Sequence, residues 1–220
     1  MLDRAGYFRR WAELHGGYDP ADSALARGWL TLVYAAARRI VAVPPLAVTG
    51  AGVLAAVSVP LLSWAYAGPG AAGWLLAAAA LAVLSGFLDS LDGAVAMLSA
   101  RAGPRGFVLD SVADRLADSA YAVAFWVLGA PGWLCVLGGG LAGLQEYVRA
   151  RAGAAGMTEV GVVTVWERPT RVILTAGVLL ATVAVGERFT AVPTAGALAW
   201  TVLGVVGLTQ LSCVLRWRLG

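Results

Sequence analysis

The sequence predicts an all-α integral membrane protein, with six transmembrane helices and an N-terminal amphipathic helix on the membrane surface. Of its 220 residues, 60% are hydrophobic and only 13% are charged, which is too apolar a composition for a soluble domain with a polar shell. Apolar runs of the ~20 residues that cross a bilayer at about 1.5 Å per residue recur along the chain. The arginines collect on one side of these runs, which indicates a fixed orientation in the membrane.

The six spans differ in where their polar residues fall. The second span continues without a break into Asp89 and Asp92, so these acids lie at the end of a membrane helix. The third span carries its acids in its first turns, and the fourth becomes polar at its end. The fifth is long enough only if Arg171 and its neighbours extend to the membrane surface. The predicted spans are residues 46–68, 71–88, 106–130, 131–152, 172–186 and 192–215.

Residues 1–45 precede the first span and are predicted to form a cytoplasmic segment. Within this segment, residues 24–43 alternate Arg27, Arg38 and Arg39 with apolar residues at helical spacing. Such a pattern is typical of an amphipathic helix that lies in the membrane interface. No apolar stretch follows a basic start in the first part of the segment, so we expect no cleaved signal peptide.

The expected topology follows from the basic residues, all of which are arginines. The stretches after the first and third spans carry none, whereas arginines crowd both termini and the stretches after the second and fourth spans. The positive-inside bias therefore places both chain ends and the even-numbered loops in the cytoplasm of a multi-pass cell-membrane protein. The net charge of +3 requires no nucleic-acid partner, because contact with anionic membrane lipids accounts for it.

Five aspartates lie between the second and third spans. A carboxylate inside a membrane helix costs at least ~2.5 kcal/mol, so this group requires compensation by cations. Two of the acids are i and i+3 on one helix and three are successive i+4 steps on the next, so each set projects from one face. A Gly-Pro turn between the helices folds one back beside the other, which would bring the two acidic faces together. The acids are Asp89, Asp92, Asp110, Asp114 and Asp118.

Converging carboxylates without nearby histidine or cysteine favour Mg²⁺ or Mn²⁺ over zinc. Two such ions would fit, and an acidic two-metal site is typical of phosphoryl transfer. Gly93 and Ala96 keep the same helix narrow beside the acids, so that a large ligand can approach. Two alternatives remain open from the residues alone. The acids could form an ion-pair network with Arg115 or another arginine, or they could belong to an ion or proton carrier.

The acidic residues also carry a resemblance to a known family. The pattern Asp89-x-x-Asp92-Gly93-x-x-Ala96, followed by Gly106-x-x-x-Asp110-x-x-x-Asp114, resembles the signature of the CDP-alcohol phosphotransferases, also called CDP-alcohol phosphatidyltransferases. The chain departs from that signature at Met97, where the family usually has arginine. Six spans that follow a surface helix are similar to the plan of the family. The resemblance implies that residues 46–220 form the catalytic domain and that the enzyme acts in phospholipid biosynthesis.

The resemblance implies roles for individual residues. Two divalent ions would bridge the diphosphate of CDP-diacylglycerol, and Asp114 would also act as general base on the acceptor alcohol, with CMP leaving. Arg101 and Arg105 would supply the charge that Met97 does not. The implied metal ligands are Asp89, Asp92, Asp110 and Asp114, and the implied nucleotide and CDP-lipid contacts are Gly93, Ala96, Thr49, Arg101 and Arg105.

Arginines at the polar ends of the later spans point to a phosphorylated acceptor, because the guanidinium fork matches phosphate oxygens. The stretches EYVRARAGAAG (146–156) and WERPTR (166–171) resemble segments of actinobacterial phosphatidylinositol-phosphate synthases. The resemblance implies a phosphorylated polyol, inositol phosphate first and glycerol phosphate second. An amino-alcohol acceptor and a non-enzymatic scaffold remain alternatives. The candidate acceptor-phosphate residues are Arg149, Arg151, Arg168, Arg171 and Arg216.

The fourth span contains a motif of small residues. Gly139-x-x-x-Gly143 suits close packing of helices, either within the chain or across a homodimer. The run is no phosphate-binding loop, because no strand precedes it.

Overall fold

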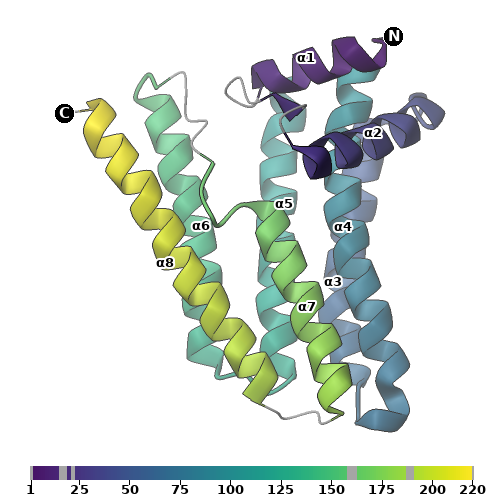
Figure 1. The fold of residues 1–220 in the computed structure, drawn as a ribbon, viewed down its shortest axis with the longest axis vertical. Helices are drawn as coiled ribbons and strands as arrows, with labels where there is room; N and C mark the ends of the chain where they lie inside the picture. The colour runs from purple at the N-terminus through teal and green to yellow at the C-terminus, as the bar shows by residue number, and fades with distance from the viewer. Residues whose placement is uncertain (1, 15–18, 21–22, 158–162, 187–190, 220) are drawn as a thin grey trace. The chain divides into compact units, whose positions relative to one another are not determined.

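The computed structural model describes residues 2–14, 19–20, 23–157, 163–186 and 191–219. Within these ranges the chain forms eight α-helices and one short 3-10 helix, and no strand occurs among the described residues (Figure 1). The predicted all-α class is therefore confirmed. The elements are α1 (Arg4–Leu14), α2 (Ala24–Arg39), α3 (Pro45–Ala65), η2 (Pro69–Ala71), α4 (Ala72–Leu98), α5 (Pro104–Val127), α6 (Gly132–Ala154), α7 (Arg168–Val185) and α8 (Ala191–Leu219).

Four of these helices are long and apolar enough to cross a membrane, namely α3, α4, α7 and α8. Helices α5 and α6 contain 24 and 23 residues, which is enough for a bilayer of ~30 Å. Acids and arginines along α5, and polar residues in the last turns of α6, lower their hydropathy. The predicted six spans therefore correspond to four strongly apolar helices and to α5 and α6, which are long enough but carry charged residues.

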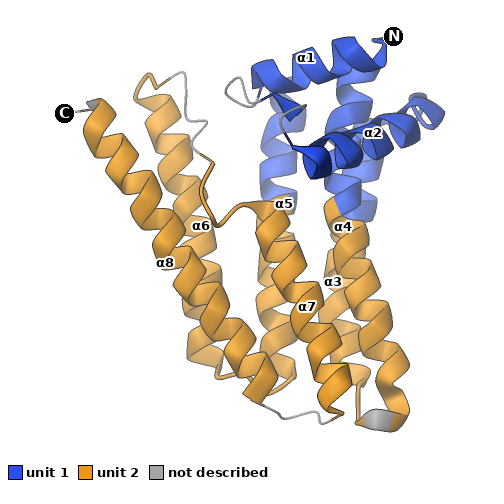
Figure 2. Cartoon of the chain, viewed as in Figure 1, with its two compact units in different colours: residues 1–52, 87–113 blue, residues 53–86, 114–220 orange. Residues whose placement is uncertain are grey.

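The chain divides into two compact units, coloured separately in Figure 2. Unit 1 comprises residues 1–52 and 87–113, and unit 2 comprises residues 53–86 and 114–220. Helices α3, α4 and α5 each run through a boundary between the units. The site residues predicted from the sequence are therefore divided between the two units.

The core of unit 1 forms where α2 presents one apolar face. Leu30, Val33, Tyr34 and Ala37 follow the i, i+3, i+4, i+7 spacing and are all buried, as expected for an amphipathic helix against a protein core. Ser23 begins the helix by accepting a hydrogen bond from the Ala26 N–H at 3.3 Å. The helix ends at Arg39, earlier than the predicted residue 43. The prolines that follow disfavour helical backbone in the residues before them.

The core of unit 2 combines alanines with five buried aromatic side chains, one of which is Tyr66. Trp200 lies edge-on to Tyr121, Phe125 and Trp166, with ring centroids 5.0–6.3 Å apart. Helix α8 runs beside α6 and α7 (Figure 1). A Cβ at Gly138 would lie 2.8 Å from Trp200 Cδ1, so glycine is required there for the contact between α6 and α8.

Close helix packing involves a different glycine from the predicted pair. A Cβ at Gly139 would reach Ala122 only at an ordinary 3.6 Å, and one at Gly143 would meet nothing within 4 Å. The neighbouring Gly138 therefore makes the close contact within the chain. The homodimer expected from the small-residue motif stays a prediction.

Candidate active site

The chain reverses direction between α4 and α5 inside unit 1. The Arg101 N–H donates to the Ala96 carbonyl at 2.9 Å and closes the last turn of α4. Ala100 adopts a left-handed φ of 55°, a conformation that costs a non-glycine residue roughly 1 kcal/mol or more. Pro104 then opens α5, a position that suits its fixed φ. The predicted reversal between α4 and α5 occurs, with Ala100 as its left-handed residue.

This reversal gathers carboxylates from both helices. Half-buried Asp89 of α4 and Asp110 of α5 offer carboxylate oxygens within 4.8 Å of each other. Asp114 follows Asp110 by one turn of α5 and also offers an oxygen within 4.8 Å of it. The donors are hard carboxylate oxygens, which suit a divalent cation of the magnesium type. These residues could therefore hold a metal ion.

Asp92 occupies a different environment one turn beyond Asp89. It is only 5% exposed, and its Oδ2 accepts a hydrogen bond from the Thr49 hydroxyl at 2.6 Å. Thr49 lies in the first turns of α3, so this bond ties that helix to α4. The sequence links Thr49 to a nucleotide pocket, and the structure places it directly against a predicted metal ligand.

The predicted nucleotide contacts lie in unit 1, as do Asp89, Asp92 and Asp110. Gly93 is exposed, and a Cβ added there would meet nothing within 4 Å, so open space lies beside Asp92. Met97 packs against the apolar core of the unit. Arg101 donates to the Ala42 carbonyl at 3.3 Å, and Arg105 is exposed. The side chain at position 97 thus contributes to the core, whereas both nearby arginines lie at the surface.

Unit 2 holds a network of alternating acids and arginines, with Arg171 at its buried centre. Arg171 is 1% exposed, and its Nη1 donates to Asp118 Oδ2 at 2.5 Å. Its Nη2 donates to Glu146 Oε1 at 3.2 Å and to the Trp166 carbonyl at 3.1 Å. A buried charge is tolerated only with such pairing. The alternative of an ion-pair network therefore holds for Asp118.

A second part of the network links α6 to the start of α7. Arg149 donates to Glu167 Oε2 at 2.8 Å and to Glu146 Oε1 at 3.3 Å. Glu167 also accepts bonds from the Thr164 N–H and hydroxyl, both at 2.7 Å. Burial alone would raise the pKa of Glu167, but the hydrogen bonds and charge of Arg149, with those of Thr164, outweigh burial and hold the pKa below its ordinary value of 4.5.

Asp114 joins the same network at the point where α5 enters unit 2. It forms an ion pair with Arg168 and lies 3.8 Å from Arg115 Nη2. Arg115 also approaches Asp118 at 3.1 Å. Counting four arginines against four carboxylates, 4 − 4 = 0, the network has no net formal charge. Its members are Arg115, Arg149, Arg168, Arg171, Asp114, Asp118, Glu146 and Glu167.

The five arginines expected to bind an acceptor phosphate therefore separate into two groups. Arg149, Arg168 and Arg171 have carboxylate partners, whereas Arg151 and Arg216 are exposed. Sequence reasoning missed the carboxylate partner Glu167. The feature that could have identified Glu167 is its position at the start of α7, where negative charge is favourable.

Comparisons with known proteins bear on this arrangement. A family model described as CDP-alcohol phosphatidyltransferase matches residues 45–208. Archaetidylinositol phosphate synthase from Aeropyrum pernix is 36% identical over 107 residues, covering 48% of this chain and 50% of the relative. The same-named protein from Methanothermobacter thermautotrophicus is 42% identical over 106 residues, covering 47% and 53%. The chain thus spans about half the length of these relatives.

A solved structure extends the comparison over more of the chain. The crystal structure of Mycobacterium tuberculosis phosphatidylinositol phosphate synthase with CDP-DAG bound matches with a TM-score of 0.66 and 24% identity. The match covers 84% of this chain and 94% of that one, and it supports the fold. The family match confirms the resemblance predicted from the aspartates and glycines. Because that match covers well over half of the chain, this protein belongs to the CDP-alcohol phosphatidyltransferase family.

Proposed function

We propose that this protein transfers a phosphatidyl group from CDP-diacylglycerol to a hydroxyl of a phosphorylated polyol and releases CMP. Inositol phosphate is the favoured acceptor and glycerol phosphate the second. The proposal rests on one observation above all: in a member of this family, Asp89 and Asp110 offer carboxylate oxygens within 4.8 Å of each other. The names of the archaeal relatives, archaetidylinositol phosphate synthases, support inositol phosphate as the acceptor.

Four aspartates would hold two divalent ions, Mg²⁺ or Mn²⁺. Asp89, Asp110 and Asp114 would supply direct carboxylate ligands. Asp92 would supply another, oriented by its 2.6 Å bond from Thr49, as hydrogen-bonded ligands at metal sites usually are. When bound, the ions would neutralise charge on the diphosphate and on the departing CMP. The open space beside Gly93 would admit the nucleotide, with Ala96, Arg101 and Arg105 around it.

Asp114 would act as general base and take the proton of the attacking hydroxyl. One oxygen of its carboxylate forms an ion pair with Arg168, and release from Arg168 would free that oxygen to take the proton. The same release would free the Arg168 guanidinium for the acceptor phosphate. Acceptor binding and base activation would thus be coupled through one exchanged ion pair.

The remaining acceptor arginines would take different parts. Arg151 and Arg216 are exposed and could approach an arriving phosphate directly. Arg149 would exchange Glu146 or Glu167 for the phosphate. Buried Arg171 would bind less directly, because Asp118 and Glu146 already hold its guanidinium; it would fix the network that presents Arg149 and Arg168.

The proposed enzyme would cross the cell membrane six times, with α5 and α6 joining the four apolar helices. Residues 1–45 would form the cytoplasmic segment, with α2 in the membrane interface, and residues 46–220 would form the catalytic domain. Both termini and the acidic site would face the cytoplasm, as the arginine distribution indicates. A homodimer in the membrane would complete the assembly.

The test is CMP release by the purified full chain with Mg²⁺ or Mn²⁺ across inositol phosphate, glycerol phosphate, serine and free inositol. CDP-diacylglycerol is compared with its ether-linked archaetidyl counterpart, because the relatives are archaetidylinositol phosphate synthases. Asp114→Asn serves as the blank, and Glu13→Gln, on the exposed surface of α1, as the matched control. Release with a phosphorylated polyol that Asp114→Asn abolishes supports the proposal. Release only with serine or free inositol, or none with any acceptor, contradicts it.

A further inference from the structure

A cavity between α1 and α2 is lined by arginines rather than by the acids of the candidate active site. It has a volume of about 470 Å³ and is lined by Arg4, Thr31, Tyr34, Ala35, Arg38 and Arg39, all within unit 1. No carboxylate lines it. Its volume falls in the range of about 300–1,000 Å³ found for small-molecule sites. Three guanidinium groups in one cavity select for an anion.

Aromatic contacts hold the two helices that carry these arginines. Tyr7 of α1 stacks on Tyr34 of α2, with ring centroids 5.4 Å apart and an interplanar angle of 29°. The Tyr34 hydroxyl donates to the Leu2 carbonyl at 3.2 Å. Burial raises the pKa of Tyr7 to about 12, so this ring stays neutral at physiological pH. The two helices therefore present their arginines from a fixed scaffold.

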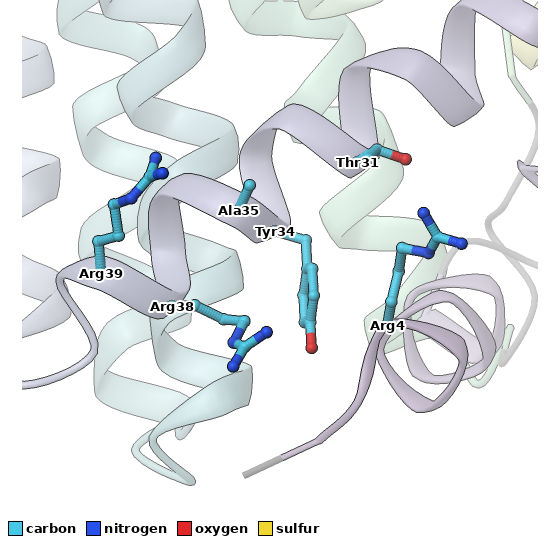
Figure 3. A pocket seen from close by; sticks show the side chains of 6 residues that line it. All are labelled: Arg4, Thr31, Tyr34, Ala35, Arg38 and Arg39. Atoms are coloured by element: carbon cyan, nitrogen blue, oxygen red, sulfur yellow. The ribbon is translucent and has the colours of Figure 1, made fainter.

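Two of the arginines, Arg4 and Arg38, flank the Tyr34 ring (Figure 3). Figure 3 shows that ring between Arg38 on α2 and Arg4 on α1. The Arg38 guanidinium lies 5.7 Å from the ring centroid, close enough for a cation–π contact that limits its movement. The Thr31 hydroxyl donates to the Arg27 carbonyl at 2.7 Å, so its proton is already committed. Recognition of an anion therefore falls to Arg4, Arg38 and Arg39.

Among the described residues of the chain, no ion pair involves Arg4, Arg38 or Arg39. Among the described residues of unit 1, the ion pair found on α1 joins Arg10 to Glu13. The carboxylate of Asp3 instead accepts the Gly6 N–H at 2.7 Å and begins α1. An external anion would therefore meet guanidinium groups that need not exchange a partner, in contrast to the paired arginines of unit 2.

The position of the cavity in the chain favours a lipid as the source of the anion. Arg39 ends α2, and α3, an apolar candidate span, begins at Pro45. The short connection between them reaches at most ~20 Å at about 3.3 Å per residue. Leu25 and Leu32 on α2 are 87% and 56% exposed, which suits contact with the interface. An adjoining cavity of about 630 Å³ shares Arg4 and Thr31 and adds apolar Phe8.

We propose that the cavity between α1 and α2 binds the phosphate of an anionic lipid head group, with Arg4 and Arg38 as the principal ligands. This site is separate from the proposed transfer reaction. The guanidinium forks of Arg4 and Arg38 would hold the phosphate oxygens, and Arg39 would add charge at the edge. The lipid would fasten residues 1–45 to the membrane surface beside α3.

The test measures binding of dihexanoyl phosphatidylglycerol, dihexanoyl phosphatidylcholine and inorganic phosphate to the full chain in nonionic detergent, with CDP-diacylglycerol added to occupy the transferase site. The double variant R4Q/R38Q removes the two ligands. R9Q/R10Q removes the same charge from α1 outside the cavity. We expect phosphatidylglycerol to bind at least fivefold more tightly than phosphatidylcholine. R4Q/R38Q should weaken it at least tenfold, and R9Q/R10Q less than twofold.

Several results would overturn the proposal. Equal losses in the two double variants would mean diffuse attraction rather than a built site, and equal affinity for phosphatidylcholine would remove the selectivity for an anion. Inorganic phosphate that binds as tightly as phosphatidylglycerol, with the same loss in R4Q/R38Q, would assign the cavity to a soluble phosphate instead of a lipid. If R4Q/R38Q unfolds, R38Q alone is used, with an expected loss of at least threefold against less than 1.5-fold for R9Q.

Discussion

The two units treat the same chemical group, a partly buried carboxylate, in opposite ways. In unit 1 the acids of α4 and α5 gather with one another, as the 4.8 Å approach of Asp89 and Asp110 shows. In unit 2 each carboxylate of the network lies against an arginine, as in the pair of Arg171 and Asp118. Like charges at this range repel each other unless a cation lies between them. The first arrangement suits a bound cation, whereas the second pairs its carboxylates with arginines of the chain.

Asp114 belongs to both arrangements. It continues the acidic face of α5 one turn after Asp110, and it forms an ion pair with Arg168. A residue with two competing partners is well placed to change partner during a reaction. The comparison therefore predicts that substitutions in unit 1 mainly affect chemistry, that buried ones in unit 2 mainly affect stability, and that those beside Asp114 affect acceptor binding.

The largest effect is expected from Asp110→Asn. The loss of a carboxylate from the proposed metal set should lower the rate of CMP release about 1,000-fold, since such ions clamp the attacking and leaving oxygens. The thermal midpoint should fall less than in a variant of buried Arg171, because Asp110 is only half-buried. Steady-state CMP release and thermal unfolding in detergent measure the two effects. A fall in the midpoint with activity retained would contradict the contrast between the units.

The next effect concerns stability in unit 2. Arg171→Met should destabilise the protein by about 3–5 kcal/mol, because it leaves buried Asp118 without its main counter-charge. The matched control is Arg10→Gln, which breaks a pair whose side chains are 58% and 61% exposed and should cost under about 1 kcal/mol. Denaturant unfolding in detergent compares them. Similar costs for the two variants would show that burial of the unit 2 network contributes little.

A smaller and more selective effect is expected from Arg168→Gln. The variant should raise the KM for the phosphorylated acceptor roughly 10–100-fold, the worth of one charge-assisted hydrogen bond of about 1.5–3 kcal/mol. The KM for the CDP-lipid should change less than threefold. Arg218→Gln, at the exposed end of α8, is the control. A rise in the KM of the CDP-lipid alone would place Arg168 on the donor side.

The acidic face could be predicted from the sequence because its information is local. Spacings of three and four residues fix which side chains share a helix face, and a Gly-Pro signal marks the reversal between α4 and α5. The helix that carries Asp89 and Asp92 was likewise expected from an apolar run that ends in acids. Its continuation to Leu98 follows because Ala94, Val95 and Leu98 are buried in the core of unit 1.

The arginine network could not be predicted to the same depth, because its pairings join distant parts of the chain. Arg171 and Asp118 lie 53 residues apart, and no local period indicates their contact. The positions of the arginines in the sequence indicate a polar region, but the number of carboxylates that pair with them depends on tertiary packing. The left-handed φ of Ala100 and the close contact at Gly138 rather than Gly139 likewise could not be predicted from local spacing.

The smallest expected effect is a change in how the thermal midpoint depends on pH, and it involves Glu167 of the unit 2 network. The folded state holds the pKa of Glu167 below its ordinary value of 4.5, so this group stabilises the fold fully above that value. The stabilisation falls away as the pH drops through the lowered pKa of the folded state. Glu167→Gln cannot titrate and should therefore lose less of its thermal midpoint than the wild type between pH 6 and about pH 3. Glu13→Gln, at the exposed pair on α1, should follow the wild-type curve. If Glu167→Gln falls as steeply as the wild type, the acid sensitivity arises from titrating groups other than Glu167, and the stability of unit 2 in acid does not depend on this residue.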